Sequence, residues 1–289
     1  MTMNLPKELL CIIAEFCDRR DRAKLVLIDR RVGQIPRLWK SLTIYDNDPP
    51  LEWFVKNVDC LKTSLQFLTT SNYISTHFFP NLKKQVIHGD KIHVQLGNVE
   101  TIKLDSFSYV TVDMRKPQRN IKSLSITAFS IRCHFSPNYL PGLTSLTITN
   151  CTLDRTLMSK ISKFLRLEKL VLNCNRIFGE SESELDWSMA PTLKHVIMQS
   201  IKSGIICLSW FEKCPLLEIL KISGKDVSSQ LRPFLFNARV VNLPSVKSFT
   251  LETRNGIHTL PRINIPSVNK VCIDGVFYSS LAECLRAYY

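Results

Sequence analysis

The segment LEKLVLNCNRI occupies residues 167–177, and the pattern of its first six residues returns along much of the chain. Apolar residues stand at its first, fourth and sixth positions, Leu167, Leu170 and Leu172. Copies of this phrase follow one another at intervals of 22 to 29 residues. The eight copies begin at Val99, Ile121, Leu143, Leu167, Leu193, Leu217, Val246 and Val268. Such near-constant spacing indicates one structural unit repeated in series.

The alternation inside the phrase predicts a short strand whose fourth and sixth side chains point to one side and whose third, fifth and seventh point to the other. One such strand cannot bury its apolar side alone, whereas stacked copies form a continuous core beneath a parallel sheet. With Asn175 and Ile177, the phrase at residue 167 completes the pattern L-x-x-L-x-L-x-x-N-x-I of leucine-rich repeats, which it resembles. We expect an α/β solenoid with its parallel sheet on the concave face and mixed helical and extended segments on the convex side. The helical spacing of apolar residues predicts convex helices at residues 159–165 and 209–214. An ordinary α/β domain with Leu-rich strands does not account for the regular spacing.

The composition is that of a folded protein, with 289 residues of which 45% are hydrophobic and 22% charged. Lys7, Glu8 and Glu15 interrupt the apolar residues at the N-terminus, so neither a signal peptide nor an anchor is expected. No apolar stretch has the length of a membrane span, so we expect no membrane partner. Ten cysteines are scattered along the chain, and we expect reduced thiols in a protein of the cytoplasm, the nucleus or both.

The formal net charge of +13 favours acidic partners, although it also serves solubility. Nucleic acid is not the expected partner, because the basic residues between 19 and 31 alternate with Asp18, Asp21 and Asp29. The chain also has no stripe of basic and aromatic residues of the kind that stacks bases. A nucleic-acid binder would show an affinity that collapses with salt.

Residues 1 to about 45 have helical periodicity that does not share the repeat. Pro6 suits the first position of a helix, and Leu9, Ile12, Ile13 and Phe16 then recur on one face. A second helix is predicted from near Asp18 or Asp21, and a third up to about Gln34, where Pro36 ends it.

This N-terminal segment resembles an F-box from end to end. The resemblance is carried by LPKELL at residues 5–10, Ile13, Phe16, Asp21, Leu25, Arg30, Arg31 and PRLW at residues 36–39. The chain is therefore similar to F-box and leucine-rich repeat proteins. The resemblance implies a non-catalytic substrate-recognition subunit of a Skp, cullin and F-box ubiquitin ligase, in which the repeats bind a substrate protein and the F-box docks the Skp adaptor and, through it, a cullin. The adaptor-binding residues that it implies are Leu5, Pro6, Leu9, Ile13 and Phe16.

Two residues depart from the F-box pattern. Val32 stands near the place where many F-boxes carry tryptophan, and Gly33 weakens the third helix by about 1 kcal/mol relative to alanine. The alternative is a three-helix cap that seals the open end of the solenoid, as repeat arrays require. The chain would then be an interaction scaffold built on leucine-rich repeats, without a ligase role.

The chain divides into four parts on these patterns. We expect an F-box over 1–45, an irregular start of the solenoid with degenerate repeats over 51–98, about eight leucine-rich repeats over 99–277 and a C-terminal capping helix over 278–289. The polar, proline-rich residues 46–50 mark the first boundary, although WKSLTI at residues 39–44 already imitates the repeat phrase. Degenerate copies are expected at residues 82–87 and within 61–74, and SLAE at residues 280–283 predicts a capping box.

No catalytic, cofactor or metal site is predicted. The sequence has no C-x-x-C pair, no H-x-x-x-H pair, no phosphate-binding loop and no G-x-S-x-G motif. Cys133 and His134 are neighbours and point in different directions on a strand. Cys151, Cys174 and Cys214 stand where such repeats place residues that satisfy backbone groups in the turn, so we expect them to be structural.

The outward positions of the phrase predict a concave face made mostly of small hydroxyl side chains, with four lysines and three carboxylates. Adjacent repeats interrupt this pattern with three apolar residues surrounded by basic ones, which is the anatomy of an interaction hot spot. A register slip that buries one of them is the alternative. The predicted substrate-binding residues are Lys169, Val171, His195, Ile197, Ile219 and Lys221.

Overall fold

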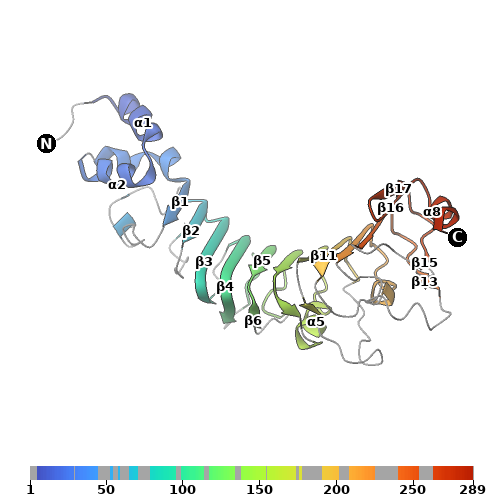
Figure 1. Ribbon diagram of the computed structural model, residues 1–289. Coiled ribbons are helices and arrows are strands. Elements are labelled where there is room, and N and C mark those ends of the chain that lie inside the picture. Colours follow the sequence, from blue (N-terminus) through green and yellow to red (C-terminus); the bar gives the residue numbers. More distant parts are fainter. Residues whose placement is uncertain are drawn as a thin grey trace.

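The chain forms a curved, elongated solenoid with helices at both ends (Figure 1). This architecture comes from a computed structural model, which describes the following residues: 5–28, 30–44, 53–54, 58, 65–70, 79–95, 99–113, 117–133, 138–153, 155–173, 176–177, 191–201, 208–224, 240–253 and 263–288.

A single sheet of 13 strands runs the length of the described solenoid. Its neighbouring strands pair in parallel except for the last pair, β16 and β17, so the predicted parallel-sheet solenoid is confirmed. The strands in sheet order are β1 (Ser41–Ile44), β2 (Phe67–Thr70), β3 (Lys84–Gln95), β4 (Thr101–Asp113), β5 (Ser123–Thr127), β7 (Ser145–Thr149), β9 (Lys169–Asn173), β11 (His195–Ile201), β12 (Ile219–Gly224), β14 (Ser248–Thr253), β16 (Lys270–Ile273) and β17 (Val276–Tyr278), with β6 (Ser130–Cys133) beside β4.

Each of the eight predicted phrases forms one strand of this sheet, β4, β5, β7, β9, β11, β12, β14 and β16. The degenerate copies expected before residue 99 correspond to β1, β2 and β3 of the same sheet. β3 and β4 are longer than the phrase. Their pairing is interrupted by a register shift near Gly89 and resumes at Lys91 and Tyr109. Ser106 stabilises the chain at this register shift, since its hydroxyl donates to the carbonyl oxygen of Asp90 at 2.6 Å and accepts from the backbone N–H of Ser108.

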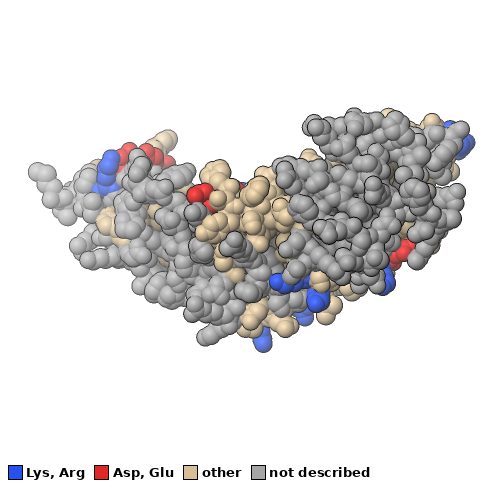
Figure 2. Space-filling model, turned by 60° about the horizontal axis from the view of Figure 1, so that its bottom comes forward, with Lys and Arg blue, Asp and Glu red and all other residues tan. Residues whose placement is uncertain are grey.

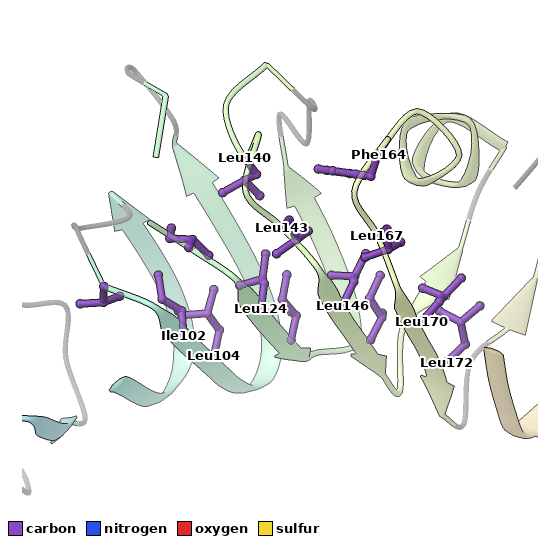
Figure 3. Packing of buried hydrophobic residues seen from close by; sticks show 14 of the residues in the cluster. Ile102, Leu104, Leu124, Leu140, Leu143, Leu146, Phe164, Leu167, Leu170 and Leu172 are labelled. Carbon is purple, nitrogen blue, oxygen red and sulfur yellow. The ribbon is translucent and has the colours of Figure 1, made fainter. Parts of the chain in front are cut away.

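The core lies directly under the sheet, where the fourth and sixth side chains of successive phrases stack (Figure 3). All sixteen of these side chains are fully buried, so the predicted alternation holds through the array. They are Ile102, Leu104, Leu124, Ile126, Leu146, Ile148, Leu170, Leu172, Val196, Met198, Leu220, Ile222, Phe249, Leu251, Val271 and Ile273.

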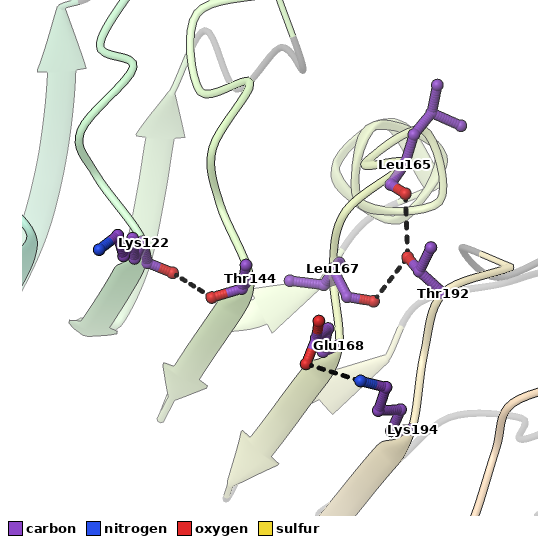
Figure 4. A network of polar contacts seen from close by, with 7 residues as sticks. All are labelled: Lys122, Thr144, Leu165, Leu167, Glu168, Thr192 and Lys194. Atoms are coloured by element: carbon purple, nitrogen blue, oxygen red, sulfur yellow. Dashed lines mark hydrogen bonds and ion pairs between the residues drawn. The ribbon is translucent and has the colours of Figure 1, made fainter.

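A polar ladder joins successive turns where the strands begin (Figure 4). The backbone N–H of Glu168 donates to the carbonyl oxygen of Thr144 at 2.8 Å, and the Thr144 hydroxyl donates to the carbonyl oxygen of Lys122 at 3.1 Å. Lys194 Nζ lies 3.2 Å from Glu168 Oε2. Because the same position is bonded from turn to turn, the strands enter the sheet in register.

The N-terminal helices pack on one another and on the two 3₁₀ helices that lead into the sheet. α1 (Lys7–Phe16) and α2 (Arg19–Ile28) match the predicted helices, and the Asp18 carboxylate caps α2 by accepting the Asp21 N–H at 2.9 Å. The predicted third α-helix is wrong: the segment forms two 3₁₀ helices, η1 (Arg30–Gln34) and η2 (Pro36–Trp39). Ile35 lies between them and, like most residues before a proline, is extended.

The convex side is mixed, as expected, but two of its elements differ from the prediction. The helix expected at 159–165 is α5 (Arg155–Ile161), and the helix expected at 209–214 is a short 3₁₀ helix, η4 (Leu208–Phe211). Extended pairs complete this side in the described residues, β8 (Thr152–Leu153) with β10 (Arg176–Ile177) and β13 (Val241–Asn242) with β15 (Ile263–Asn264).

The chain ends in α8 (Leu281–Tyr288), which packs beside β16 and β17. Ser280 caps it, because its hydroxyl accepts the Glu283 N–H at 3.2 Å. The Glu283 carboxylate in turn accepts from the backbone N–H of Ser279 at 2.8 Å and from its hydroxyl at 2.6 Å. The predicted capping box therefore forms, with its return bonds one residue earlier than the standard arrangement.

Candidate functional site

α1 carries apolar side chains on two opposite sides. Leu10 and Ala14 are buried in the core, with 1% and 0% of their surface exposed. Leu9, Ile12 and Ile13 are 46%, 48% and 39% exposed. Since the inner side already anchors the helix, the outer side is not needed to hold it on the solenoid.

The outer side of α1 holds most of the residues predicted to bind an adaptor. Leu9 and Ile13 are one helical turn apart, and Phe16 follows at the end of the helix with 88% of its surface exposed. Pro6 is exposed at the start of the helix, and its carbonyl oxygen accepts the Leu10 N–H at 3.1 Å. Leu5 differs from the other four, because it is half-buried and packs against the core. We call Leu9, Ile12, Ile13 and Phe16 the outer face of α1.

The predicted concave site occupies three neighbouring strands, β9, β11 and β12. Lys169, His195 and Ile219 lie in one row across these strands. Val171, Ile197 and Lys221 lie in the next row. The structure therefore brings all six predicted side chains together on the concave face of the sheet.

The three apolar residues of this site are contiguous. Val171 and Ile197 are direct neighbours across two strands, and Ile219 is diagonal to Ile197 across the next pair. All three side chains are half-buried, so no register slip has turned one of them into the core. Lys169 and Lys221 stand at opposite corners of the apolar triplet.

Ion pairs neutralise most of the charge on the described concave face. Lys221 Nζ lies 3.6 Å from Glu252 Oε1, and Lys103 Nζ lies 3.3 Å from Asp105 Oδ2. Lys169 is exposed and has no ion-pair partner among the described residues. In Figure 2, the described Lys and Arg residues in the central part of the molecule lie toward its lower edge. A ligand on the concave face therefore meets an apolar centre with one uncompensated lysine beside it.

One outward position does not behave as predicted. Cys272 stands at the fifth, outward position of the phrase that begins at Val268, yet it is buried, with 2% of its surface exposed. β17 turns back antiparallel beside β16 and places Phe277 opposite Cys272. The Phe277 ring also lies under Lys270, whose Nζ is 5.2 Å from the ring centroid. The last strand of the repeat array, β16, is therefore flanked by β17, and the phrase alone could not predict this antiparallel strand.

Two of the three cysteines predicted to be structural, Cys151 and Cys214, lie in the described residues and are buried. Burial raises the pKa of the Cys214 thiol to about 12, so it stays protonated and unreactive at neutral pH. The Cys151 thiol donates to the carbonyl oxygen of Thr152 at 3.4 Å. Cys174 and His134 lie outside the described residues. Within the described ranges, no group of three or more His, Cys, Asp or Glu side chains is placed to hold a metal ion.

None of the helices in the described part of the chain has the length and apolar character needed to cross a membrane. In comparisons with known proteins, no family model matches the chain. No curated protein matches it either.

Proposed function

We propose that this protein is the substrate-recognition subunit of a Skp, cullin and F-box ubiquitin ligase, with an F-box over residues 1–45 and leucine-rich repeats in the solenoid. The observation that carries the proposal is the outer face of α1, which stays exposed although the other side of the helix is packed. It supports a docking role because a helix that serves only as a cap requires one apolar side.

In this proposal the outer face of α1 inserts into the Skp adaptor. Leu9, Ile13 and Phe16 supply the apolar contacts, and removing their apolar surface from water favours the complex by about 25 cal/mol per Å² before the entropic costs of association are subtracted. Pro6 presents the first turn of the helix to the adaptor. Leu5 acts indirectly, because it packs inward and holds the start of the helix against the solenoid.

The concave site of β9, β11 and β12 would bind the substrate protein. Val171, Ile197 and Ile219 form the apolar centre, and Lys169, His195 and Lys221 surround it. The subunit performs no chemistry of its own. It raises the effective concentration of a substrate lysine near the charged ubiquitin-conjugating enzyme, which converts a bimolecular encounter into an intramolecular one.

The test is co-purification of the full chain with the Skp adaptor, using the triple variant Leu9→Ala, Ile13→Ala and Phe16→Ala. The matched control replaces three exposed apolar side chains elsewhere, Leu165→Ala, Leu216→Ala and Phe277→Ala. We expect a stable complex with the native chain and the control, and none with the α1 variant. Leu5 is left intact because its replacement would also disturb packing.

Failure of the native chain to bind the adaptor would overturn the ligase proposal. The N-terminal helices would then be a cap, and the protein would be a scaffold that uses the concave site of β9, β11 and β12. Equal binding by the native chain and the α1 variant would move the adaptor contact to another surface. Circular dichroism of each variant shows whether loss of binding reflects loss of folding.

A further inference from the structure

Two adjoining grooves open on the rim of the solenoid where the strands begin. The first has a volume of about 540 Å³ and includes Lys83 and Lys122 in its lining. The second has a volume of about 700 Å³ and includes Pro141, Leu165 and Arg166. Arg119 lines both, so the two grooves meet at this side chain, and we call them together the rim groove.

The floor of the rim groove is rigid. Leu140 and Phe164, which lie in the loops leading into β7 and β9, are buried with 1% and 2% of their surface exposed (Figure 3). Gly142 packs so closely on the preceding turn that a Cβ atom there would collide with the carbonyl oxygen of Arg119. The backbone that carries Arg119 is therefore fixed against the next turn, and the groove is preformed.

The charge of the rim groove is unbalanced. Its one described carboxylate, Glu100, pairs with Lys122 at 3.4 Å. Lys83, Arg119 and Arg166 are exposed and have no ion-pair partner among the described residues. Further along the same rim, by contrast, the Lys194 and Lys247 side chains pair with Glu168 and Glu218.

The second half of the rim groove also has an apolar lining. Pro117 and Pro141 are exposed along it, and Leu165 presents 69% of its surface. Two arginines, Arg119 and Arg166, line the same half. A guanidinium group binds a carboxylate through two parallel hydrogen bonds, and an apolar surface beside it accepts an apolar side chain.

We infer that the rim groove binds an extended acidic segment of a partner protein. Aspartate or glutamate side chains of that segment pair with Arg119 and Arg166, and one of its apolar side chains packs on Pro141 and Leu165. The groove follows successive turns about 4.8 Å apart, which suits an extended chain lying across them. The excess of positive charge in the sequence, +13, favours the same kind of ligand. Nucleic acid fits less well, since the only described aromatic side chain in the lining, Phe164, is buried and offers no stacking surface.

The test is fluorescence anisotropy of the purified full chain with labelled synthetic peptides of about a dozen residues. The probe alternates aspartate with small residues and has a leucine at its centre. One control peptide carries lysine in place of aspartate, and another carries serine in place of leucine. We expect the acidic leucine peptide to bind and the lysine peptide not to bind. The serine peptide is expected to bind about tenfold more weakly than the leucine peptide, which corresponds to about 1.4 kcal/mol.

Variants of the chain locate the binding site. Arg119→Gln and Arg166→Gln are each expected to weaken binding about fivefold, and the double variant at least about twentyfold, because each removes a charged hydrogen-bonding partner. Arg286→Gln in α8 removes the same charge at the other end of the solenoid. This matched control is expected to change the affinity for the peptide less than about twofold, since Arg286 lies farther from the rim groove than the Debye length over which salt screens a charge.

Three results would overturn the inference. The first is no binding of the acidic peptide at millimolar concentration, and the second is an equal loss of binding in Arg286→Gln and Arg119→Gln. The third is tighter binding of a single-stranded oligonucleotide of equal charge, which would make the groove a nucleic-acid surface. The inference does not rest on the proposed ligase role, because the peptide assay needs no adaptor and the α1 triple variant is expected to bind the peptide normally.

Discussion

The two terminal helices, α1 and α8, cover opposite ends of the solenoid and differ in what they leave exposed. α8 buries Cys284 completely, and its exposed described side chains are Ala282, Glu283, Arg286 and Ala287. α1 buries Leu10 and exposes four large apolar side chains. Among its described side chains α8 thus exposes no large apolar residue, as a simple cap would, whereas α1 has a second apolar side that capping does not explain.

The first turns of the two helices also differ, because α8 has a side-chain cap and α1 has none. α8 begins with the Ser280 cap and the return bonds of Glu283, which stabilise it locally. α1 begins after Pro6, which has no polar side chain to cap it, so its helix depends on packing against the solenoid. The outer face of α1 is therefore presented by a helix whose position is set by its inner side. Single substitutions can therefore test separately whether an inner residue of α1 holds the helix on the solenoid and whether an outer residue binds a partner.

The largest expected effect distinguishes the two sides of α1 by neighbouring leucines. Leu10→Ala removes a fully buried side chain and is expected to lower the free energy of unfolding by about 3 kcal/mol. Leu9→Ala changes a side chain that is 46% exposed, and we expect a loss of less than about 1 kcal/mol. Urea denaturation followed by circular dichroism measures both values.

For adaptor binding, Leu9→Ala should have the larger effect and Leu10→Ala the smaller one, which is the reverse of their order in stability. Leu9→Ala is expected to weaken the complex with the Skp adaptor, whereas Leu10→Ala, measured where it is still folded, should bind normally. If Leu9→Ala is as destabilising as Leu10→Ala, the outer face of α1 is part of the core and the contrast with α8 is lost.

The second prediction concerns the junction between the N-terminal helices and the sheet. The Trp39 indole Nε1–H donates to the carbonyl oxygen of Val32 at 3.1 Å, and the ring is buried. Trp39→Phe removes this bond and leaves a small cavity, and among the described residues the Val32 carbonyl oxygen keeps only the Ile35 N–H at 3.3 Å as a donor. The expected cost is about 2 kcal/mol of unfolding free energy.

A single cooperative transition in the Trp39→Phe variant would show that the helices and the solenoid unfold together. Two transitions would show that the helices of residues 1–45 unfold independently of the solenoid. Phe54→Leu is the matched control, since Phe54 is also buried and its ring centroid is 6.2 Å from that of Trp39, but it has no polar atom to lose.

The sheet was predicted well from the sequence because the alternation within each phrase determines which of its side chains point into the core. Alternation in the phrase was sufficient to assign β5, β7, β9 and their neighbours, along with every buried fourth and sixth position. The convex side was predicted less well, since the helix at 159–165 begins four residues earlier and the one at 209–214 is a 3₁₀ turn. These segments have no repeating pattern, and Pro215 limits the room for a full helix after Leu208.

The candidate surfaces differ in how far the sequence could reveal them. Val171, Ile197 and Ile219 could be found because the phrase fixes which side chains point outward. The rim groove could not be found, because Arg119 and Arg166 stand at different distances before their strands and meet only through the turn geometry. The covered position of Cys272 was also out of reach, since it depends on the antiparallel return of β17.

The third prediction tests the local cap that α8 has and α1 lacks. Ser280→Ala removes the hydroxyl that accepts the Glu283 N–H, and we expect a loss of about 1 kcal/mol. Thermal unfolding followed by circular dichroism measures it. Ser267→Ala is the control, because Ser267 is exposed in a turn outside any helix. An unchanged midpoint in Ser280→Ala would mean that packing against the solenoid, and not the Ser280 cap, holds α8.

The smallest expected effect is a pH dependence at the same cap. Hydrogen bonds from the Ser279 hydroxyl, and then from its backbone N–H, lower the pKa of Glu283 below its ordinary value. A carboxylate whose pKa is lower in the folded state contributes stability that is complete above its unfolded pKa and disappears as the pH falls through the folded value. The stability difference between the native chain and Glu283→Gln should therefore be constant near neutrality and shrink below about pH 4. Urea titrations at several pH values measure this difference, and a difference that stays constant down to pH 3 would show that the Glu283 charge plays no part in holding α8.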